Sequence, residues 1–295
     1  MNIAKILDRA IRDDEMIRKP KLKCSYWNGV YEEYIKKECW EIIKAEMEIN
    51  YPKAFEKYGK GGGKELEERV VDNITYPPKM ASFGSSSRMI YNLFREREKE
   101  GFLFEEKLST TIGGKANLDG FWPQTYKNIY IEAKCREPYG AKNQNVSRAY
   151  EEFYKYITDS DNSLLKCEIL EIKEKDMKVN FVYGDKQIVH FDMKQMLCHF
   201  LGIATSALNG EVGDKLIEFW YLLFNPLKVT IEDAKAKEKI VEIYKATCEE
   251  CCSVDFQNVF LLTLEYLQTK KGIGREKDIT DIAKRFSFSL CDQEI

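Results

Sequence analysis

The stretch that most constrains this chain is residues 116–134, where two short apolar segments flank a turn and carry three charged residues. Asp119 lies in the first segment, and Glu132 and Lys134 lie in the second. Strand side chains alternate between the two faces of a sheet, so Glu132 and Lys134 share one face. The opposite face is apolar and consists of Ile129, Ile131, Ala133 and Cys135. The pattern predicts a hairpin that buries one face and presents a carboxylate beside an ammonium on the other.

Neighbouring strands lie about 4.8 Å apart, so the carboxylates of Asp119 and Glu132 can converge on one cation. Two carboxylates buried together resist joint ionisation, and a divalent cation relieves their repulsion. Mg²⁺ is typically held by one or two carboxylates, water and phosphate oxygens. Such an ion acidifies a water for in-line attack on phosphorus. Lys134 would position or deprotonate that water, or hold the phosphate electrostatically, and the sequence leaves these roles open.

Composition limits how such a protein could bind nucleic acid and in which compartment it would work. The net charge is −3, whereas proteins that coat nucleic acid indiscriminately carry a positive excess, so phosphate binding would use a local patch. The nine cysteines are irregularly spaced, and the opening residues lack the apolar core of an export signal, which predicts reduced thiols in a cytoplasmic protein. No apolar run approaches the roughly 20 residues needed to span a bilayer, so no membrane association is expected.

Residues 1–84 are predicted to form a helical arm and linker, and 85–295 the main domain with a C-terminal extension. In the main domain we expect a helix over 87–99, capped by the serines at 85–87, and three strands over 102–108, 116–122 and 128–135. A helix over 145–157 and a strand over 177–184 would complete a right-handed crossover that places two strands parallel.

Further elements are expected beyond residue 185. These are a helix over 192–208, a strand over 215–224 and a helix that begins at Thr230 with Asp233 in a capping box. Residues 254–268 fit helix and strand equally. The order predicts a mixed α/β (α+β) fold, with a central mixed sheet flanked by helices.

The Asp119, Glu132 and Lys134 pattern within residues 85–185 resembles the PD-(D/E)XK nuclease superfamily, and residues 186–224 resemble the longer form in uncharacterised bacterial restriction-endonuclease-like proteins. Ser86-Ser87-Arg88 stands where that form carries Ser-Ser-Arg. Leu118 replaces the proline of the motif. The resemblance implies a restriction-endonuclease-like core and a Mg²⁺-dependent nuclease, with Mn²⁺ as a substitute. It also implies that Asp119 and Glu132 are metal ligands and that Lys134 is the catalytic lysine.

A third metal ligand stays open, because many members of the superfamily add a glutamate from the first core helix. Glu96, Glu98, Glu105 and Glu106 are candidates, with Glu106 and Glu98 the residues we name for the site. The segment 95–100 also fits a solvated helix end. Substrate contacts are expected from a basic and amide-rich region after the motif and from the Ser-Ser-Arg. These residues are Arg136, Lys142, Gln144, Arg148 and Arg88.

The resulting hypothesis is an endonuclease that hydrolyses DNA, preferably double-stranded, through metal-activated water. A homodimer is a reasonable expectation, because two copies related by a two-fold axis can cut both strands. The alternatives are a non-catalytic DNA-binding or scaffold protein that keeps the fold, a structure-specific repair or RNA nuclease, and a helical interaction protein that acts through residues 1–84. His190 and His199 are interpreted as packed or surface residues.

Overall fold

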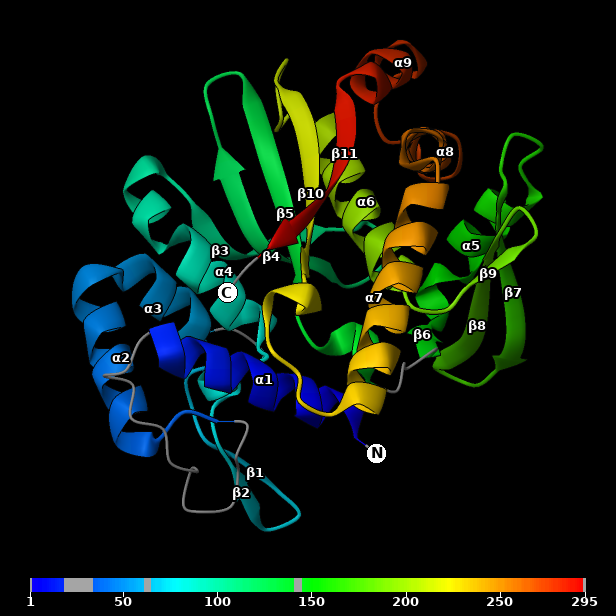
Figure 1. The fold of residues 1–295 in the computed structure, drawn as a ribbon. Helices are drawn as coiled ribbons and strands as arrows, with labels where there is room; N and C mark the ends of the chain where they lie inside the picture. The colour runs from blue at the N-terminus through cyan, green and yellow to red at the C-terminus, as the bar shows by residue number, and fades with distance from the viewer. Residues whose placement is uncertain (1, 19–33, 61–64, 141–144, 294–295) are drawn as a thin grey trace.

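A computed structural model describes residues 2–18, 34–60, 65–140 and 145–293 (Figure 1). Its centre is a five-stranded mixed sheet in the order β11-β10-β5-β4-β3. The strands are β3 (Leu103–Ser109), β4 (Lys115–Pro123), β5 (Lys127–Lys134), β10 (Leu216–Phe224) and β11 (Phe286–Gln293). The first three form an antiparallel meander, whereas β10 runs parallel to β5 and β11 runs parallel to β10. The predicted mixed α/β fold is confirmed.

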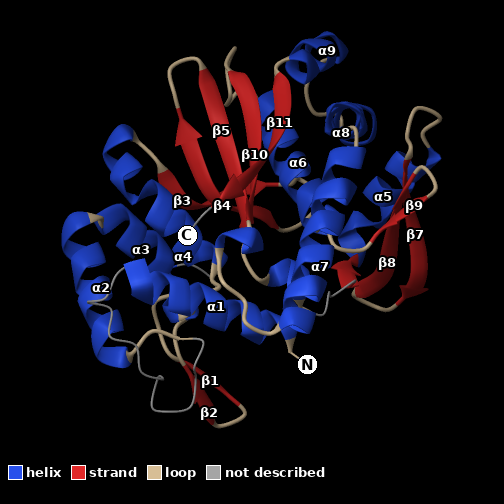
Figure 2. Ribbon diagram, viewed as in Figure 1, coloured by secondary structure: helices blue, strands red, loops and turns tan. Residues whose placement is uncertain are grey.

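Helices cover both faces of this sheet, because its strands are apolar on both sides (Figure 2). On one face α6 (Met193–Leu208) and α8 (Phe256–Lys271) pack on Ile217 and Phe219 of β10. On the other face α4 (Ser86–Phe94) and α7 (Ala234–Ser253) share a hydrophobic cluster with Ile129 and Ile131 of β5. The alternation predicted for β5 is therefore confirmed, since its aliphatic side chains face α4 and its charged ones face α6.

The remaining described helices complete the two layers. They are α1 (Ile3–Arg18), α2 (Lys37–Asn50), α3 (Pro52–Lys60), α5 (Glu151–Asp159) and α9 (Glu276–Lys284). A small hairpin of β1 (Arg69–Val71) and β2 (Ile74–Tyr76) projects beside α1. Helices α1–α3 belong to the same hydrophobic cluster as α4 and α7. The division at residue 84 stays a prediction.

Helix α6 lies unusually close to the meander because residue 202 is glycine. A Cβ at Gly202 would stand 2.8 Å from the Cβ of Ala116 and 2.9 Å from that of Leu108. Any side chain there would push the helix away from β3 and β4. This contact fixes the height of α6 over the strand that carries Glu132 and Lys134.

The crossover differs from the sequence-based prediction. The strand parallel to β5 is β10, reached through α6, and not the strand over 177–184. That segment is β8 (Asp176–Tyr183), which pairs antiparallel with β6 (Asn145–Ser147), β7 (Leu165–Ile172) and β9 (Lys186–Ile188) in a separate sheet. Figure 1 shows this small sheet and α5 to one side of the central sheet. Residues 135–192 are therefore an insertion between a core strand and its crossover helix.

Other boundaries were also corrected. The predicted helix over 145–157 begins as strand β6 and becomes helical only after residue 147. Helix α7 begins at Ala234, because Asp233 is its N-cap and accepts a hydrogen bond from the Ala236 amide at 3.0 Å. The unassigned segment 254–268 lies almost wholly in α8. Within the described ranges, no helix combines the length and apolar character needed to cross a membrane.

Candidate active site

The three motif residues line one pocket of about 190 Å³ at the edge where β4, β5 and the start of α4 meet. Asp119 comes from β4, and Glu132 and Lys134 come from β5. The pocket is also lined by Glu65, Lys79, Ser85, Ser86, Ser87, Arg136, Glu137 and Gln195. The structure thus brings Asp119, Glu132 and Lys134 together, as the strand spacing predicted.

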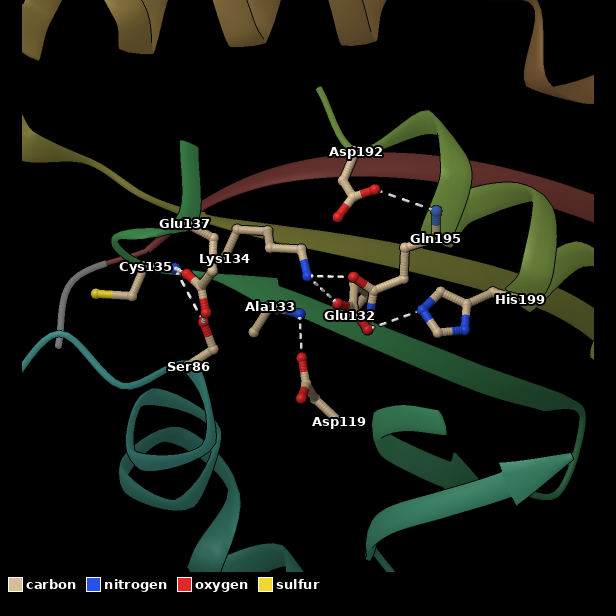
Figure 3. Close-up of polar contacts among 10 residues, drawn as sticks. All are labelled: Ser86, Asp119, Glu132, Ala133, Lys134, Cys135, Glu137, Asp192, Gln195 and His199. Carbon is tan, nitrogen blue, oxygen red and sulfur yellow. Dashed lines mark hydrogen bonds and ion pairs between the residues drawn. The ribbon is translucent and has the colours of Figure 1, made fainter. Parts of the chain in front are cut away.

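Glu132 and Lys134 form a buried ion pair that is held from α6 (Figure 3). Lys134 Nζ lies 2.5 Å from Glu132 Oε1 and donates a hydrogen bond of 2.6 Å to Gln195 Oε1. Burial opposes ionisation of both groups, but their mutual attraction raises the pKa of Lys134 well above its usual value. Lys134 therefore remains an ammonium at neutral pH and serves as a fixed positive charge.

His199 holds the second oxygen of Glu132. Its Nε2 lies 2.9 Å from Glu132 Oε2, and its ring packs against Phe219 with centroids 5.9 Å apart. Among the described residues, Nδ1 of His199 is buried without a hydrogen-bond partner, so Glu132 is the polar contact of this ring. Although burial favours the neutral acid, Lys134 and His199 lower the pKa of Glu132. Glu132 is consequently ionised and oriented on both sides.

Asp119 is positioned by the backbone of the neighbouring strand. Pairing of β4 with β5 ends at Gly120 opposite Ile131, and beyond that point Asp119 Oδ2 accepts a 2.7 Å hydrogen bond from the Ala133 amide. Burial and the Glu132 carboxylate raise the pKa of Asp119 well above its usual value. Within the described part of the chain only Oδ2 of Asp119 is hydrogen-bonded, which leaves Oδ1 open to a ligand.

Glu106 and Glu98 do not line the pocket, whose further carboxylates are Glu65 and Glu137. Glu105 lies outside the pocket wall but interacts electrostatically with Glu132 and Asp119. Pairing of β3 with β4 skips the position where Glu105 stands opposite Asp119, and Glu105 has a φ of 51°. This left-handed backbone turns its side chain out of the regular alternation. Burial, followed by repulsion from Glu65 and Glu132, raises the pKa of Glu105 to about 7. Glu105 therefore belongs to the same electrostatic cluster as Asp119.

The other glutamates have structural partners. Glu98 is buried and caps α3, accepting hydrogen bonds from the Lys53 and Ala54 amides at 3.3 and 2.8 Å. Glu106 forms an ion pair with Lys57 of α3 at 3.2 Å. The Tyr51 hydroxyl donates a hydrogen bond to Glu96. These contacts lie on the α3 side of the sheet, so the assignment of Glu98 or Glu106 to the metal site is not supported.

Among the proposed substrate-binding residues that the structure describes, only Arg136 lines the pocket, where it pairs with Asp8 of α1 at 3.0 Å. Arg88 is buried in an ion pair with Glu15 and is absent from the pocket wall. Arg148 is half exposed and pairs with Glu151 in the inserted segment. Lys142 and Gln144 lie outside the described residues. Arg88 is thus a structural residue, and the substrate contact of Arg136 stays a prediction.

Sequence reasoning missed Gln195 and His199. They lie one helical turn apart on α6, and each touches one member of the Glu132–Lys134 pair. A signal was available, since residues four apart share a helix face and both are polar within the apolar run of 193–208. The interpretation of His199 as a packed histidine agrees with its burial, but it missed the contact with Glu132.

Replacing Glu105 with glutamine is expected to stabilise the protein above pH 7 and to change little below pH 4. The pKa of Glu105 is higher in the folded state than in the unfolded state. Its contribution to the free energy of unfolding is therefore fully present below the unfolded-state pKa near 4.5 and is lost as pH rises through about 7. The gain should be about 2 kcal/mol, since each pKa unit corresponds to about 1.4 kcal/mol and partial solvation reduces the total. Urea denaturation at pH 4 and pH 8 in EDTA measures it. Equal effects at both pH values would contradict the assignment.

The donor set fits a hard divalent cation. Two carboxylates are available for it, because Oδ1 of Asp119 accepts no hydrogen bond from the described residues and Glu132 is ionised. In the described part of the chain no three His, Cys, Asp or Glu side chains are close enough to form a complete metal cage. Mg²⁺ does not need one, because it is typically held by one or two carboxylates together with water and phosphate.

Comparison of the chain with protein-family models, with curated proteins and with solved structures finds no match in any of the three.

Proposed function

We propose that this protein is a Mg²⁺-dependent endonuclease that hydrolyses DNA phosphodiester bonds. One observation carries the proposal. Asp119, Glu132 and Lys134, from two adjacent strands, line a single pocket in which carboxylates with opposed pKa shifts lie beside a fixed ammonium. Perturbed titratable groups gathered in a cleft are typical of catalytic sites.

Asp119 and Glu132 would hold the cation, with Mn²⁺ as a substitute. When bound, Mg²⁺ would supply an acidified water and charge stabilisation at phosphorus. The protein's own contribution is orientation. Gln195 fixes the Lys134 ammonium, which attracts a phosphate oxygen, and His199 fixes the Glu132 carboxylate. Because Lys134 stays protonated, it acts electrostatically rather than as a base.

The preference for DNA over RNA, the use of double-stranded substrate, a homodimeric state and a cytoplasmic location belong to the same proposal. They follow from the resemblance to restriction-endonuclease-like proteins and from the cysteine usage. Arg136 and Lys79 line the pocket, each paired with a carboxylate, Asp8 and Glu65, and would exchange these partners for the phosphate backbone.

One feature favours a non-catalytic protein that retains the fold for DNA binding. Both oxygens of Glu132 are already bonded, to Lys134 and to His199, so a metal must displace or share one of these partners. A repair or RNA nuclease remains a further alternative, distinguished by comparing duplex DNA, single-stranded DNA and RNA in one assay.

Replacing Lys134 with methionine is expected to reduce cleavage of plasmid DNA in Mg²⁺ about 100-fold, the typical effect of removing one preorganised electrostatic contact. The matched control is Lys127→Met, because Lys127 lies in the same strand and also pairs with a glutamate, Glu218, but is absent from the pocket wall. Gel assays with Mg²⁺ or EDTA measure the rate. Absence of wild-type cleavage, or equal loss in the two variants, would refute the catalytic proposal.

A further inference from the structure

A second cavity, of about 230 Å³, lies next to the candidate active site. It shares Lys134 and Glu137 with the catalytic pocket and extends from them under the inserted sheet. Its other walls come from β8, from the segment that joins β9 to α6, and from Tyr221 of β10. The two pockets are therefore neighbours that share part of one wall.

The walls of this cavity suit a flat ring. Phe181, Phe191 and Tyr221 line it, and the Phe191 and Tyr221 rings pack on each other with centroids 4.9 Å apart and a tilt of 53°, so a ligand ring would rest on this aromatic wall and not between the two rings. Val179, Ile188 and the half-exposed Val189 supply aliphatic surface. The volume is below the roughly 300–1,000 Å³ typical of pockets for drug-sized ligands. It therefore suits one ring system rather than an extended molecule.

Asp192 gives the cavity a hydrogen-bond acceptor. One of its oxygens accepts a 3.1 Å bond from the Gln195 amide and caps α6, and Figure 3 shows the other turned away from Gln195. A carboxylate accepts from an exocyclic amino group, as in contacts with cytosine. The same chemistry disfavours a ring edge that offers a carbonyl oxygen.

The wall is also held in place before any ligand binds. The amides of His190 and Phe191 both donate to the same Glu250 oxygen of α7, at 2.6 and 2.7 Å. These two hydrogen bonds fix the segment that presents Phe191 and Asp192 to the cavity. A preformed apolar cavity with a few placed polar groups is typical of ligand sites.

We propose that this cavity receives one unstacked nucleobase with an exocyclic amino group, from the strand whose phosphate lies beside Lys134. The inference rests on the proposed function and narrows its substrate to a strand with an unpaired or flipped base. An extruded base is commonly held by aromatic and apolar walls and read through its edge. Lys134 then connects the two sites, since this residue lines both the phosphate pocket and the base cavity.

The first test uses a single-stranded oligonucleotide that carries the fluorescent base 2-aminopurine, bound to the Asp119→Asn protein so that cleavage is suppressed. Emission should rise on binding, because the base leaves its stack. Adding Val189→Trp fills the cavity and should abolish the rise and weaken binding about tenfold, in line with the loss of one stacked base. Adding Leu170→Trp instead is the matched control, since Leu170 has a similar exposure of 51% against 48% but lies on β7 away from the cavity.

The second test uses wild-type protein on strands of a single base. Cytosine and adenine strands should be cut about tenfold faster than thymine strands, within the range of discrimination given by one well-placed base contact. Asp192→Asn keeps the helix cap but adds a donor, so it should reduce this preference. Equal cleavage rates on the cytosine, adenine and thymine strands would overturn the proposed role of Asp192 in selecting the base.

The outcomes separate this inference from the proposed function. Cleavage by the wild type with unchanged 2-aminopurine emission would overturn the base cavity and leave the nuclease standing. A rise in emission without cleavage by the wild type would support the cavity and overturn catalysis. Failure of the oligonucleotide to bind would overturn the base cavity.

Discussion

Replacing Asp119 with asparagine is expected to reduce Mg²⁺-dependent cleavage about 1,000-fold while making the protein more stable. Under the proposed function the rate falls because one proposed cation ligand becomes neutral, a loss comparable with removing a strong preorganised electrostatic contact. Stability rises because burial and Glu132 hold the pKa of Asp119 well above its usual value. The contribution of this carboxyl to the free energy of unfolding is fully present below its unfolded-state pKa near 3.9. It is lost as pH rises through the higher pKa of the folded state.

Asparagine keeps an oxygen that accepts the hydrogen bond from the Ala133 amide, so the hairpin should stay intact. Cleavage rates at saturating Mg²⁺, and urea denaturation at pH 5 and pH 8 in EDTA, measure both effects. Asp176→Asn is the control, because Asp176 is an exposed carboxylate at the start of β8. A variant that is still active would show that the Asp119 carboxylate is not catalytic. An inactive variant that is less stable at pH 8 would show that Asp119 has a structural role.

Replacing Glu15 with alanine is expected to destabilise the protein by about 3–5 kcal/mol. Arg88 Nη2 lies 2.7 Å from Glu15 Oε1, and the two side chains are 6% and 1% exposed. Within the described ranges Nε and Nη1 of Arg88 are buried without hydrogen-bond partners, so Glu15 provides the main compensation for the buried guanidinium there. Removing it leaves a cation in an apolar environment between α1 and α4, which is the costly case.

Denaturant midpoints measure this effect, and two further variants control it. The double variant Glu15→Met, Arg88→Met should recover most of the loss, because an apolar pair can replace a buried ion pair. Glu56→Ala, which breaks the exposed Glu56–Lys60 pair, should leave the midpoint unchanged. If Arg88 were a substrate contact instead, Glu15→Ala would leave stability intact and change DNA binding.

The sequence predicted the meander and its charged face well, because those features depend on local alternation. Residues 129–135 separate into two faces by their chemistry alone, and Gly113 and Gly114 adopt the positive φ values expected of their turn. Ser85 caps α4 as predicted, accepting from the Arg88 amide at 3.3 Å. The pocket that joins Asp119 with Glu132 and Lys134 follows from the same local pattern.

Features that depend on distant partners were not predictable from local pattern. The alternation of Met177, Val179 and Phe181 identifies a strand, but not the sheet that it joins. The backbone of Glu105 breaks the alternation of β3, which is why the face argument selected Glu106. Arg88 was predicted to contact phosphate, because the local sequence does not reveal that Glu15 of α1, far away in the sequence, pairs with it.

The position of the inserted segment 135–192 has a consequence for how such a protein diversifies. It leaves the core directly after Lys134 and returns at α6, so β5 and β10 pair without its help. Lengthening a connection costs only about 0.6 kcal/mol for each doubling. The pairing of β5 with β10 therefore tolerates changes in the length of this segment, whereas its buried side chains, such as Phe153 and Tyr154, must still match those of α6 and α8.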